Sequence, residues 1–249
     1  MKIDAVLFDI NGTLVDILTD DNHLGIFRKI RNFLNYMEIY AHKLELKELY
    51  FQTMKEQRAA SKEEFPEFDS EAVWKKILEL KHTDFSRQLP PEVLKSLPLM
   101  ISRLYRSLTL CRKLTPYPDV REVLEQLSKV YPLGIVSDAQ TAYGLPELRA
   151  VNLADYFKTV VISGDYGYRK PDRRIYQTAL DALHVKAENT VFVGNDMYRD
   201  IYGPKQMGMK TVLFASNQGD QESHGAKPDY ITYQFSQLPT ALEFLKENH

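Results

Sequence analysis

Residues 5–13 read AVLFDINGT, and this stretch decides the fold that we expect for the chain. Four apolar residues lead to Asp9, and the turn-forming residues Asn11 and Gly12 follow within three positions. A continuous apolar run of this length is typical of a strand that is covered on both faces, as in a parallel sheet. The stretch therefore predicts a buried strand that ends on a carboxylate, with Asn11 two residues further along.

Comparable apolar runs recur along the chain and are bounded by turn-forming or polar residues. They comprise residues 5–8, 133–136, 160–162, 190–193 and 211–214. Stretches with the helical spacing of apolar residues lie between and after these runs, at residues 120–130, 174–183 and 235–245. This alternation of strands and helices predicts an α/β protein with a doubly wound, mainly parallel sheet.

The region from about Asp16 to Tyr117 breaks this alternation, because it contains no convincing strand. Amphipathic stretches occupy residues 23–58, 68–81 and 91–110, with loop-like segments between them. We therefore expect a helical domain of roughly 100 residues inserted after the first strand, with residues 114–119 as the return hinge. The expected limits are residues 1–16 with 117–249 for the core, and 17–116 for the inserted domain.

Composition and charge narrow the class of protein further. The net charge of −2 gives no basic field of the kind that nucleic-acid-binding proteins carry. The single cysteine, Cys111, excludes an internal disulfide, and the first residues do not resemble a signal peptide. No apolar run approaches the roughly 18–20 residues of a membrane helix. We expect a cytoplasmic monomer or homodimer that binds neither nucleic acid nor membrane.

Polar side chains follow each of the first four predicted strands of the core. These are Asp9, Asn11 and Thr13 after the first, Ser137 at the end of the second, Lys170 after the third, and Asp196 and Asp200 after the fourth. Open parallel sheets bind ligands outside the carboxyl ends of their strands. We therefore expect these side chains to gather at one edge of the sheet.

The chemistry of these residue types is that of phosphoryl transfer. A carboxylate such as Asp9 can act as a nucleophile and form a covalent intermediate. Because neighbouring carboxylates repel, Asp9 and Asp196 require a proton or a shared cation, and Mg²⁺ prefers such oxygen ligands. Lys170 would neutralise a phosphoryl group, while Ser137, Thr13 and loop N–H groups would bind its oxygens. Such a site works by positioning and electrostatics.

On these motifs the chain resembles the haloacid dehalogenase superfamily of hydrolases, and its phosphatase branch in particular. DINGT (9–13) matches the first motif of that family, D-x-D-G-T, except at Asn11. Ser137, Lys170 and the pair Asp196 and Asp200 stand where the family has its second, third and fourth motifs. The motifs match in order over residues 3–214, and the helical insertion resembles the family's type 1 cap. The resemblance implies a Rossmann-like core with an all-helical cap domain.

The resemblance also implies roles for individual residues. Asp9 would form an aspartyl-phosphate, and Mg²⁺ would be held by Asp9, the backbone carbonyl of Asn11 and an acid of the fourth motif. We assign that acid to Asp196, because Asn195 stands directly after the glycine, where some relatives carry it. Asp200 and Asn195 would contact the metal ligands without binding the metal, and would orient the lysine or a metal-bound water.

Asp138 also departs from the family pattern, since the family usually has asparagine after the residue of the second motif. We expect Asp138 to lie at the substrate phosphate in a hydrogen-bonded structural role, with proton transfer as the alternative.

The residue at position 11 raises a mechanistic question. The family's phosphatases use an aspartate there as general acid and base, a role typically worth about 10²–10⁴ in rate. Asn11 can donate a hydrogen bond but cannot shuttle a proton. The leading prediction is Mg²⁺-dependent hydrolysis of a small phosphorylated metabolite through Asp9, either with a stable leaving group or with another acid.

Three other accounts of Asn11 remain open. In the first account, Asn11 is an engineered trap in a normal phosphatase. In the second, the protein would be a 2-haloacid dehalogenase or a phosphonate hydrolase of the same superfamily. In the third, it would be a catalytically weak phospho-ligand-binding protein.

Overall fold

The computed structural model describes residues 1–109 and 113–247, so Cys111 and the end of the predicted helix at residues 91–110 lie outside the described residues. The chain divides into two compact units, residues 1–17 with 114–249 and residues 18–113. The functional division between them, a catalytic core and a cap, remains a prediction.

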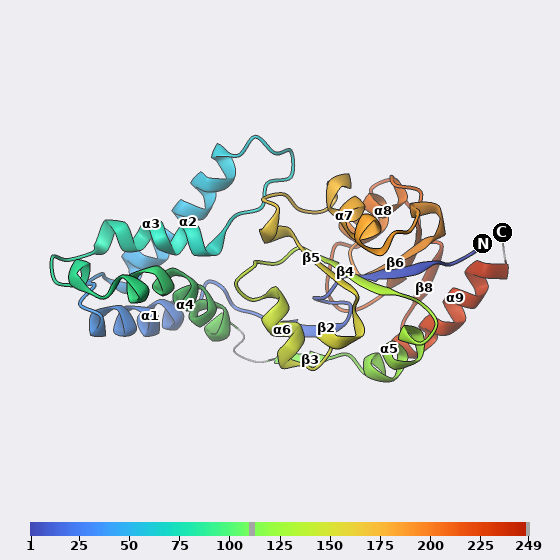
Figure 1. The fold of residues 1–249 in the computed structure, drawn as a ribbon, viewed down its shortest axis with the longest axis horizontal. Helices are drawn as coiled ribbons and strands as arrows, with labels where there is room; N and C mark the ends of the chain where they lie inside the picture. Colours follow the sequence, from blue (N-terminus) through green and yellow to red (C-terminus); the bar gives the residue numbers. More distant parts are fainter. Residues whose placement is uncertain (110–112, 248–249) are drawn as a thin grey trace. The chain divides into compact units, whose positions relative to one another are not determined.

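The first unit is built on a parallel sheet, drawn in Figure 1. Among the described residues its strands are β1 (Ala5–Phe8), β4 (Leu133–Ser137), β5 (Thr159–Ile162), β6 (Thr190–Gly194), β7 (Lys210–Phe214) and β8 (Tyr230–Thr232). Their order in space is β5-β4-β1-β6-β7-β8, and every neighbouring pair is parallel. After β1 the chain runs outward through β4 and β5, and then returns to the other side of β1 for β6. This reversal confirms the predicted doubly wound class and makes the carboxyl ends of β1, β4 and β6 the expected ligand site.

Helices cover both faces of this sheet. Val6 and Phe8 of β1 belong to one apolar cluster with helices α5 (Val120–Ser128) and α9 (Leu238–Glu247). Leu7, which points to the opposite face, packs with α7 (Arg173–Leu183). Burial on both faces explains why the strand reads as a continuous apolar run instead of an alternating one. Shorter helical segments are α6 (Gly144–Ala150), the π-helix Met197–Tyr202 and α8 (Gly203–Lys205).

The described part of the second unit is mainly helical. Its helices are α1 (Leu24–Tyr36), α2 (Lys43–Ala60), α3 (Ser70–Lys81) and α4 (Pro91–Thr109). They pack around an aromatic core in which the rings of Tyr50 and Tyr105 are 4.5 Å apart and Trp74 is fully buried. Asp69 caps α3 by accepting hydrogen bonds from the first backbone N–H groups of the helix, at 2.8 and 3.0 Å. These contacts give the unit a core of its own.

One expectation for this part of the chain was wrong. Two short strands, β2 (Val15–Leu18) and β3 (Lys113–Pro116), pair with each other at the borders of the region that we expected to contain no strand. The side chains of β3 alternate between exposed and half-buried, so the strand lacks the apolar run by which the others are recognised.

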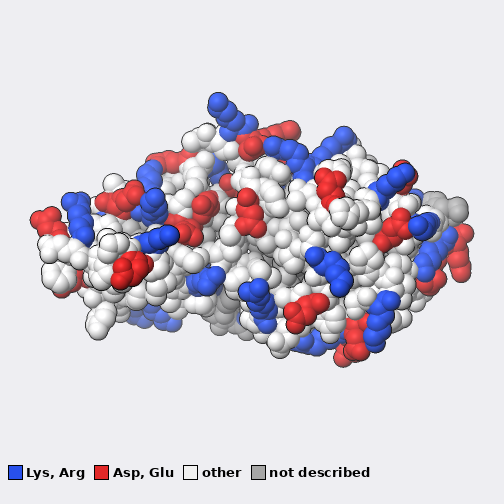
Figure 2. All heavy atoms as spheres, in the orientation of Figure 1, with Lys and Arg blue, Asp and Glu red and all other residues white. Residues whose placement is uncertain are grey.

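The surface carries charges of both signs. On the face in Figure 2, lysine and arginine side chains are interspersed with aspartate and glutamate, in keeping with the small net charge. Within the described ranges, no helix is both long enough and apolar enough to cross a membrane.

Candidate active site

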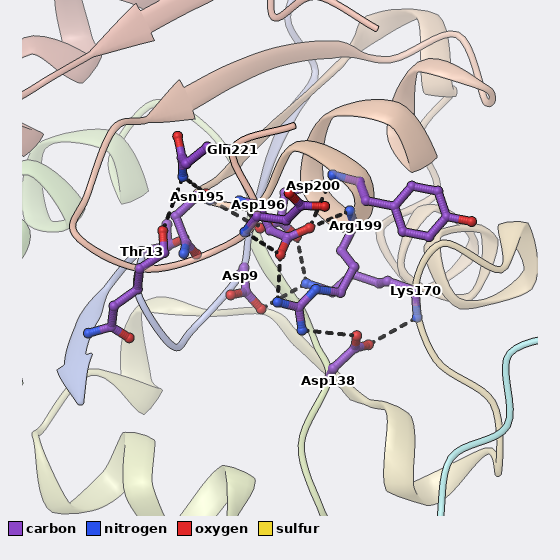
Figure 3. A network of polar contacts seen from close by, with 12 residues as sticks. Asp9, Thr13, Asp138, Lys170, Asn195, Asp196, Arg199, Asp200 and Gln221 are labelled. Atoms are coloured by element: carbon purple, nitrogen blue, oxygen red, sulfur yellow. Dashed lines mark hydrogen bonds and ion pairs between the residues drawn. The ribbon is translucent and has the colours of Figure 1, made fainter. Parts of the chain in front are cut away.

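A buried lysine joins two carboxylates at the carboxyl edge of the sheet (Figure 3). Asp9 directly follows β1, and its Oδ1 atom accepts a hydrogen bond of 2.8 Å from Lys170 Nζ. The same ammonium group donates to Asp200 Oδ1 at 2.7 Å. The side chains of Lys170, Asp9 and Asp200 are only 2%, 10% and 1% exposed. Because buried charges require partners, the lysine and the two carboxylates stabilise one another.

The surroundings shift the ionisation of this cluster. Burial acts to lower the pKa of Lys170, but the neighbouring carboxylates outweigh it and raise that pKa above its ordinary value. Burial, together with the charge of Asp9, raises the pKa of Asp200 to about 7, although Lys170 acts in the opposite direction. The lysine is therefore charged at neutral pH, and the raised pKa of Asp200 reflects its burial beside a second carboxylate.

Asp200 also fixes the loop that follows β6. Its Oδ2 atom accepts hydrogen bonds from the backbone N–H groups of Asn195 and Asp196, at 3.0 and 3.1 Å. Gly194 makes this approach possible, because a Cβ atom at that position would collide with the Asp200 side chain. The end of β6 and the lysine are thus held by a single carboxylate.

Asp196 caps the π-helix Met197–Tyr202. Its Oδ1 atom accepts from the backbone N–H groups of Tyr198 and Arg199, at 3.1 and 2.8 Å. Its Oδ2 atom accepts from Arg199 Nη2 at 2.6 Å and from the Asp220 N–H at 3.0 Å. Burial acts to raise the pKa of Asp196, but the hydrogen bonds and the charge of Arg199 together lower it to about 2. Asp196 is therefore ionised at neutral pH, with both oxygens already bonded.

Arg199 is a site residue that sequence reasoning missed. Its guanidinium group pairs with Asp196 and lies 3.7 Å from Asp138 Oδ2, measured from Nη1. The hydroxyl of Tyr176 donates to the Arg199 carbonyl and holds this part of the helix. The spacing of Asp196 and Arg199, three residues apart at the start of a helix, is the only sequence signal for the contact.

Asp138, which directly follows β4, contacts both Lys170 and Arg199. Its Oδ1 atom accepts a hydrogen bond of 3.0 Å from the backbone N–H of Lys170. We call Asp9, Asp138, Lys170, Asp196, Arg199 and Asp200 the carboxylate network. The structure thus connects five residues from distant parts of the sequence with the unpredicted Arg199.

Thr13 and Asn195 form a separate contact beside this network. The fully buried Thr13 hydroxyl donates to Asn195 Oδ1 at 2.9 Å, and Gln221 Nε2 donates to the Asn195 carbonyl at 3.3 Å. Gly12, at a φ of +83°, lies so close to the Asn195 amide that a Cβ atom would collide with it. The proposed phosphate-binding role of Thr13 remains a prediction, since its hydroxyl proton is already directed to Asn195.

Unsatisfied polar atoms concentrate at this edge of the sheet. Asn11 Oδ1, Ser137 Oγ and Asp138 Oδ2 are buried and have no hydrogen-bond partner among residues 1–109 and 113–247. The other two buried side-chain atoms in this condition, Arg58 Nε and Trp74 Nε1, belong to the second unit. Buried polar groups in proteins are normally bonded, so a cluster of exceptions calls for an explanation such as a bound ligand.

The donors available to a metal ion are few. In the described part of the chain, no three His, Cys, Asp or Glu side chains form a group that could hold a metal ion by themselves. Mg²⁺ usually takes one or two carboxylates and completes its shell with waters and substrate phosphate. Asp9 follows β1 and Asp196 follows β6, the strand beside it. The Asn11 side-chain oxygen, a different atom from the backbone carbonyl expected to bind the metal, has no hydrogen-bond partner among the described residues. This donor set is compatible with Mg²⁺ bound jointly with a phosphate.

The chain is similar to several known proteins. The family model described as "Haloacid dehalogenase-like hydrolase" matches residues 6–214. The glyceraldehyde 3-phosphate phosphatase of Pyrococcus furiosus is 35% identical over 133 residues, which are 53% of this chain and 55% of that protein. The ribulose-1,5-bisphosphate 5-phosphatase of Halopiger xanaduensis is 31% identical over 110 residues, or 44% of this chain and 46% of that protein. The chain thus matches about half the length of these curated relatives.

Solved structures extend the similarity to nearly the full length. A HAD phosphatase from Thermococcus onnurineus is 26% identical, with a TM-score of 0.58 over 96% of this chain and 98% of that one. A 2-haloacid dehalogenase from Pseudomonas syringae pv. Tomato has a TM-score of 0.70 at 23% identity, over 98% and 99% of the two chains, and shows the fold alone. From its fold, its motifs and the extent of the family match, the chain belongs to the haloacid dehalogenase-like hydrolases.

Proposed function

We propose that this protein is a Mg²⁺-dependent phosphatase of small phosphorylated metabolites, with Asp9 as the nucleophile. The observation that carries the proposal is a buried, lysine-bound carboxylate beside a cluster of unsatisfied polar atoms. The Ser137 hydroxyl can donate to a phosphoryl oxygen, a proton or a cation would satisfy the acceptor oxygens of Asn11 and Asp138, and Lys170 offsets part of the phosphoryl charge. Two of the relatives named above, a glyceraldehyde 3-phosphate phosphatase and a ribulose-1,5-bisphosphate 5-phosphatase, support this class of substrate.

The contacts of Asp9 suggest how it would act. Lys170 Nζ fixes the Oδ1 atom, while Oδ2 accepts no hydrogen bond from any described residue and is available for attack. As Oδ2 forms a bond to phosphorus, the bond from phosphorus to the leaving oxygen breaks. Water then attacks phosphorus, which releases phosphate and restores the Asp9 carboxylate. Ser137, whose hydroxyl has no hydrogen-bond partner in the described part of the chain, would donate it to a phosphoryl oxygen throughout.

The charges of the site support a requirement for Mg²⁺. The carboxylate network contains four acids and only two bases, so it is rich in negative charge even before a phosphate arrives. We propose that Asp9, the backbone carbonyl of Asn11 and Asp196 hold the ion, and that Asn195 and Asp200 contact these ligands without binding the ion. When bound, Mg²⁺ supplies positive charge that offsets the carboxylates and the phosphoryl group.

The proposal is tested by phosphate release from glyceraldehyde 3-phosphate and other small phosphate esters, before and after EDTA treatment and after Mg²⁺ is restored. We expect Mg²⁺-dependent release that is lost in Asp9→Asn. Asp229→Asn is the matched control, because Asp229 is likewise a lysine-paired aspartate but lies outside the network, with Lys205 at 2.9 Å and Lys210 at 3.4 Å. Release that survives Asp9→Asn, or halide release from a 2-haloacid without phosphatase activity, would contradict the proposal.

A further inference from the structure

Hydrolysis of an alkyl phosphate requires a proton for the leaving oxygen, and Asn11 cannot supply one. The carboxylate network offers other acids. Asp200 is bonded through both oxygens to Lys170 and to two backbone N–H groups. Asp196 is bonded through both oxygens and is ionised at neutral pH. Since Asp9 is the proposed nucleophile, Asp138 is the acid of the network that is left to carry a proton.

The contacts of Asp138 leave one of its oxygens open. The side chain is 7% exposed, and its Oδ1 atom is held by the backbone N–H of Lys170 at 3.0 Å. Its Oδ2 atom is buried and accepts no hydrogen bond from the residues described, since Arg199 Nη1 at 3.7 Å is beyond hydrogen-bonding distance. One oxygen therefore anchors the carboxyl group, while the other is ion-paired with Arg199 but accepts no hydrogen bond from the described residues, so it can still bind a proton.

The position of Asp138 suits this task. It directly follows Ser137 at the end of β4, the strand beside β1, so it leaves the sheet at the same edge as Asp9. Burial raises the pKa of the Asp138 carboxyl, and Asp9 acts in the same direction, while Lys170 and Arg199 oppose them. A buried carboxyl with a raised pKa is the usual form of a general acid.

We propose that Asp138 is the acid–base residue of this enzyme and replaces the function that Asn11 lacks. This inference rests on the proposed phosphatase function. As Asp9 Oδ2 bonds to phosphorus, the bond from phosphorus to the alkoxide oxygen breaks, and the Asp138 carboxyl protonates that oxygen to release the alcohol. Asp138, now a carboxylate, then takes a proton from the attacking water. Phosphate leaves as the bond from phosphorus to Asp9 breaks, and both residues return to their starting states.

The test compares first-turnover rates of Asp138→Asn on an alkyl phosphate and on an aryl phosphate. Asparagine keeps an oxygen for the Lys170 N–H, so the loop retains its anchor. We expect first-turnover release of the alkyl alcohol to fall by about 10²–10⁴. Release of the stable aryl leaving group should still show a rapid first turnover of about one per site, followed by slow turnover, because only the water step then lacks its base.

A second variant separates proton transfer from a structural role. The double variant Asn11→Asp/Asp138→Asn restores an acid, so its alkyl phosphatase rate should be at least about tenfold higher than that of Asp138→Asn. Asn11→Asp alone should raise the rate of the unsubstituted protein by a smaller factor. Equal losses on both esters, or no recovery in the double variant, would overturn the assignment of Asp138 and leave the phosphatase proposal standing. Absence of phosphate release from both esters in the unsubstituted protein would overturn both.

Discussion

Lys170→Met removes the ammonium group that Asp9 and Asp200 share and keeps a side chain of similar length. Breaking a buried ion pair by removing one partner typically costs about 3–5 kcal/mol, because the remaining charge is left unpaired. Here two carboxylates lose their partner, at side-chain exposures of 10% and 1%. We therefore expect the free energy of unfolding to fall by about 3–5 kcal/mol at pH 8.

The loss should depend on pH with a definite sign. Unfolded aspartates titrate near pH 4, whereas the unpaired carboxylates of the folded variant would hold protons at higher pH. In this interval the folded variant binds more protons than the unfolded chain, so its stability falls as the pH rises. We expect the loss relative to the unsubstituted protein to be smaller at pH 5.5 than at pH 8, by at least about 1 kcal/mol.

Urea unfolding followed by circular dichroism at the two pH values measures both effects. Lys246→Met is the matched control, since Lys246 pairs with Glu243 at the same distance of 2.7 Å but with side chains 33% and 62% exposed. Exposed pairs of this kind contribute about 0–1 kcal/mol. Equal losses in the two variants, or a Lys170→Met loss that grows on acidification, would refute the reasoning.

Three further predictions concern other residues of the site. Ser137→Ala removes a hydroxyl with no described partner, so stability should hold within about 1 kcal/mol while phosphate release falls about 10²-fold. Ser163→Ala, which removes an equally buried but hydrogen-bonded hydroxyl, should instead lower the free energy of unfolding in urea by about 1–3 kcal/mol. Because the pKa of Asp200 is raised in the folded state, the contribution of this residue to stability should decline as the pH rises above about 4, and urea titrations of Asp200→Asn should lack this decline. Gly12→Ala places a methyl group against Asn195 at a φ of +83°, and thermal unfolding should show a loss of roughly 1–3 kcal/mol.

The sheet was largely predictable because most of its strands are covered on both faces. Continuous apolar runs marked β1, β4, β5, β6 and β7. The edge strand β8 was not predicted, because it has only three residues and Ile231, at its centre, is 42% exposed. A short strand with a solvent-facing centre has neither the apolar run nor the length that the sequence pattern requires.

The candidate site was predictable only to the level of strand ends. Parallel strands bring their carboxyl ends to one edge, so Asp9, Ser137 and Asp200 could be expected there from the order of the strands alone. The contact of Arg199 with Asp138 joins residues 61 positions apart through the turn of a helix, which no periodicity indicates. Which polar atoms stay unsatisfied likewise depends on the folded surroundings, and these atoms carry the proposal for Asp138.

The most direct test of the central claim is whether a phosphoryl group becomes attached to Asp9. The protein with Mg²⁺ would be mixed with an aryl phosphate, quenched in acid within the first turnover, digested and examined by mass spectrometry. The account predicts that the peptide containing Asp9 gains the mass of one phosphoryl group, that Asp138→Asn accumulates more of it, and that Asp9→Asn gains none. Phosphate release without any phosphorylated peptide, or the same phosphopeptide in Asp9→Asn, would contradict the account.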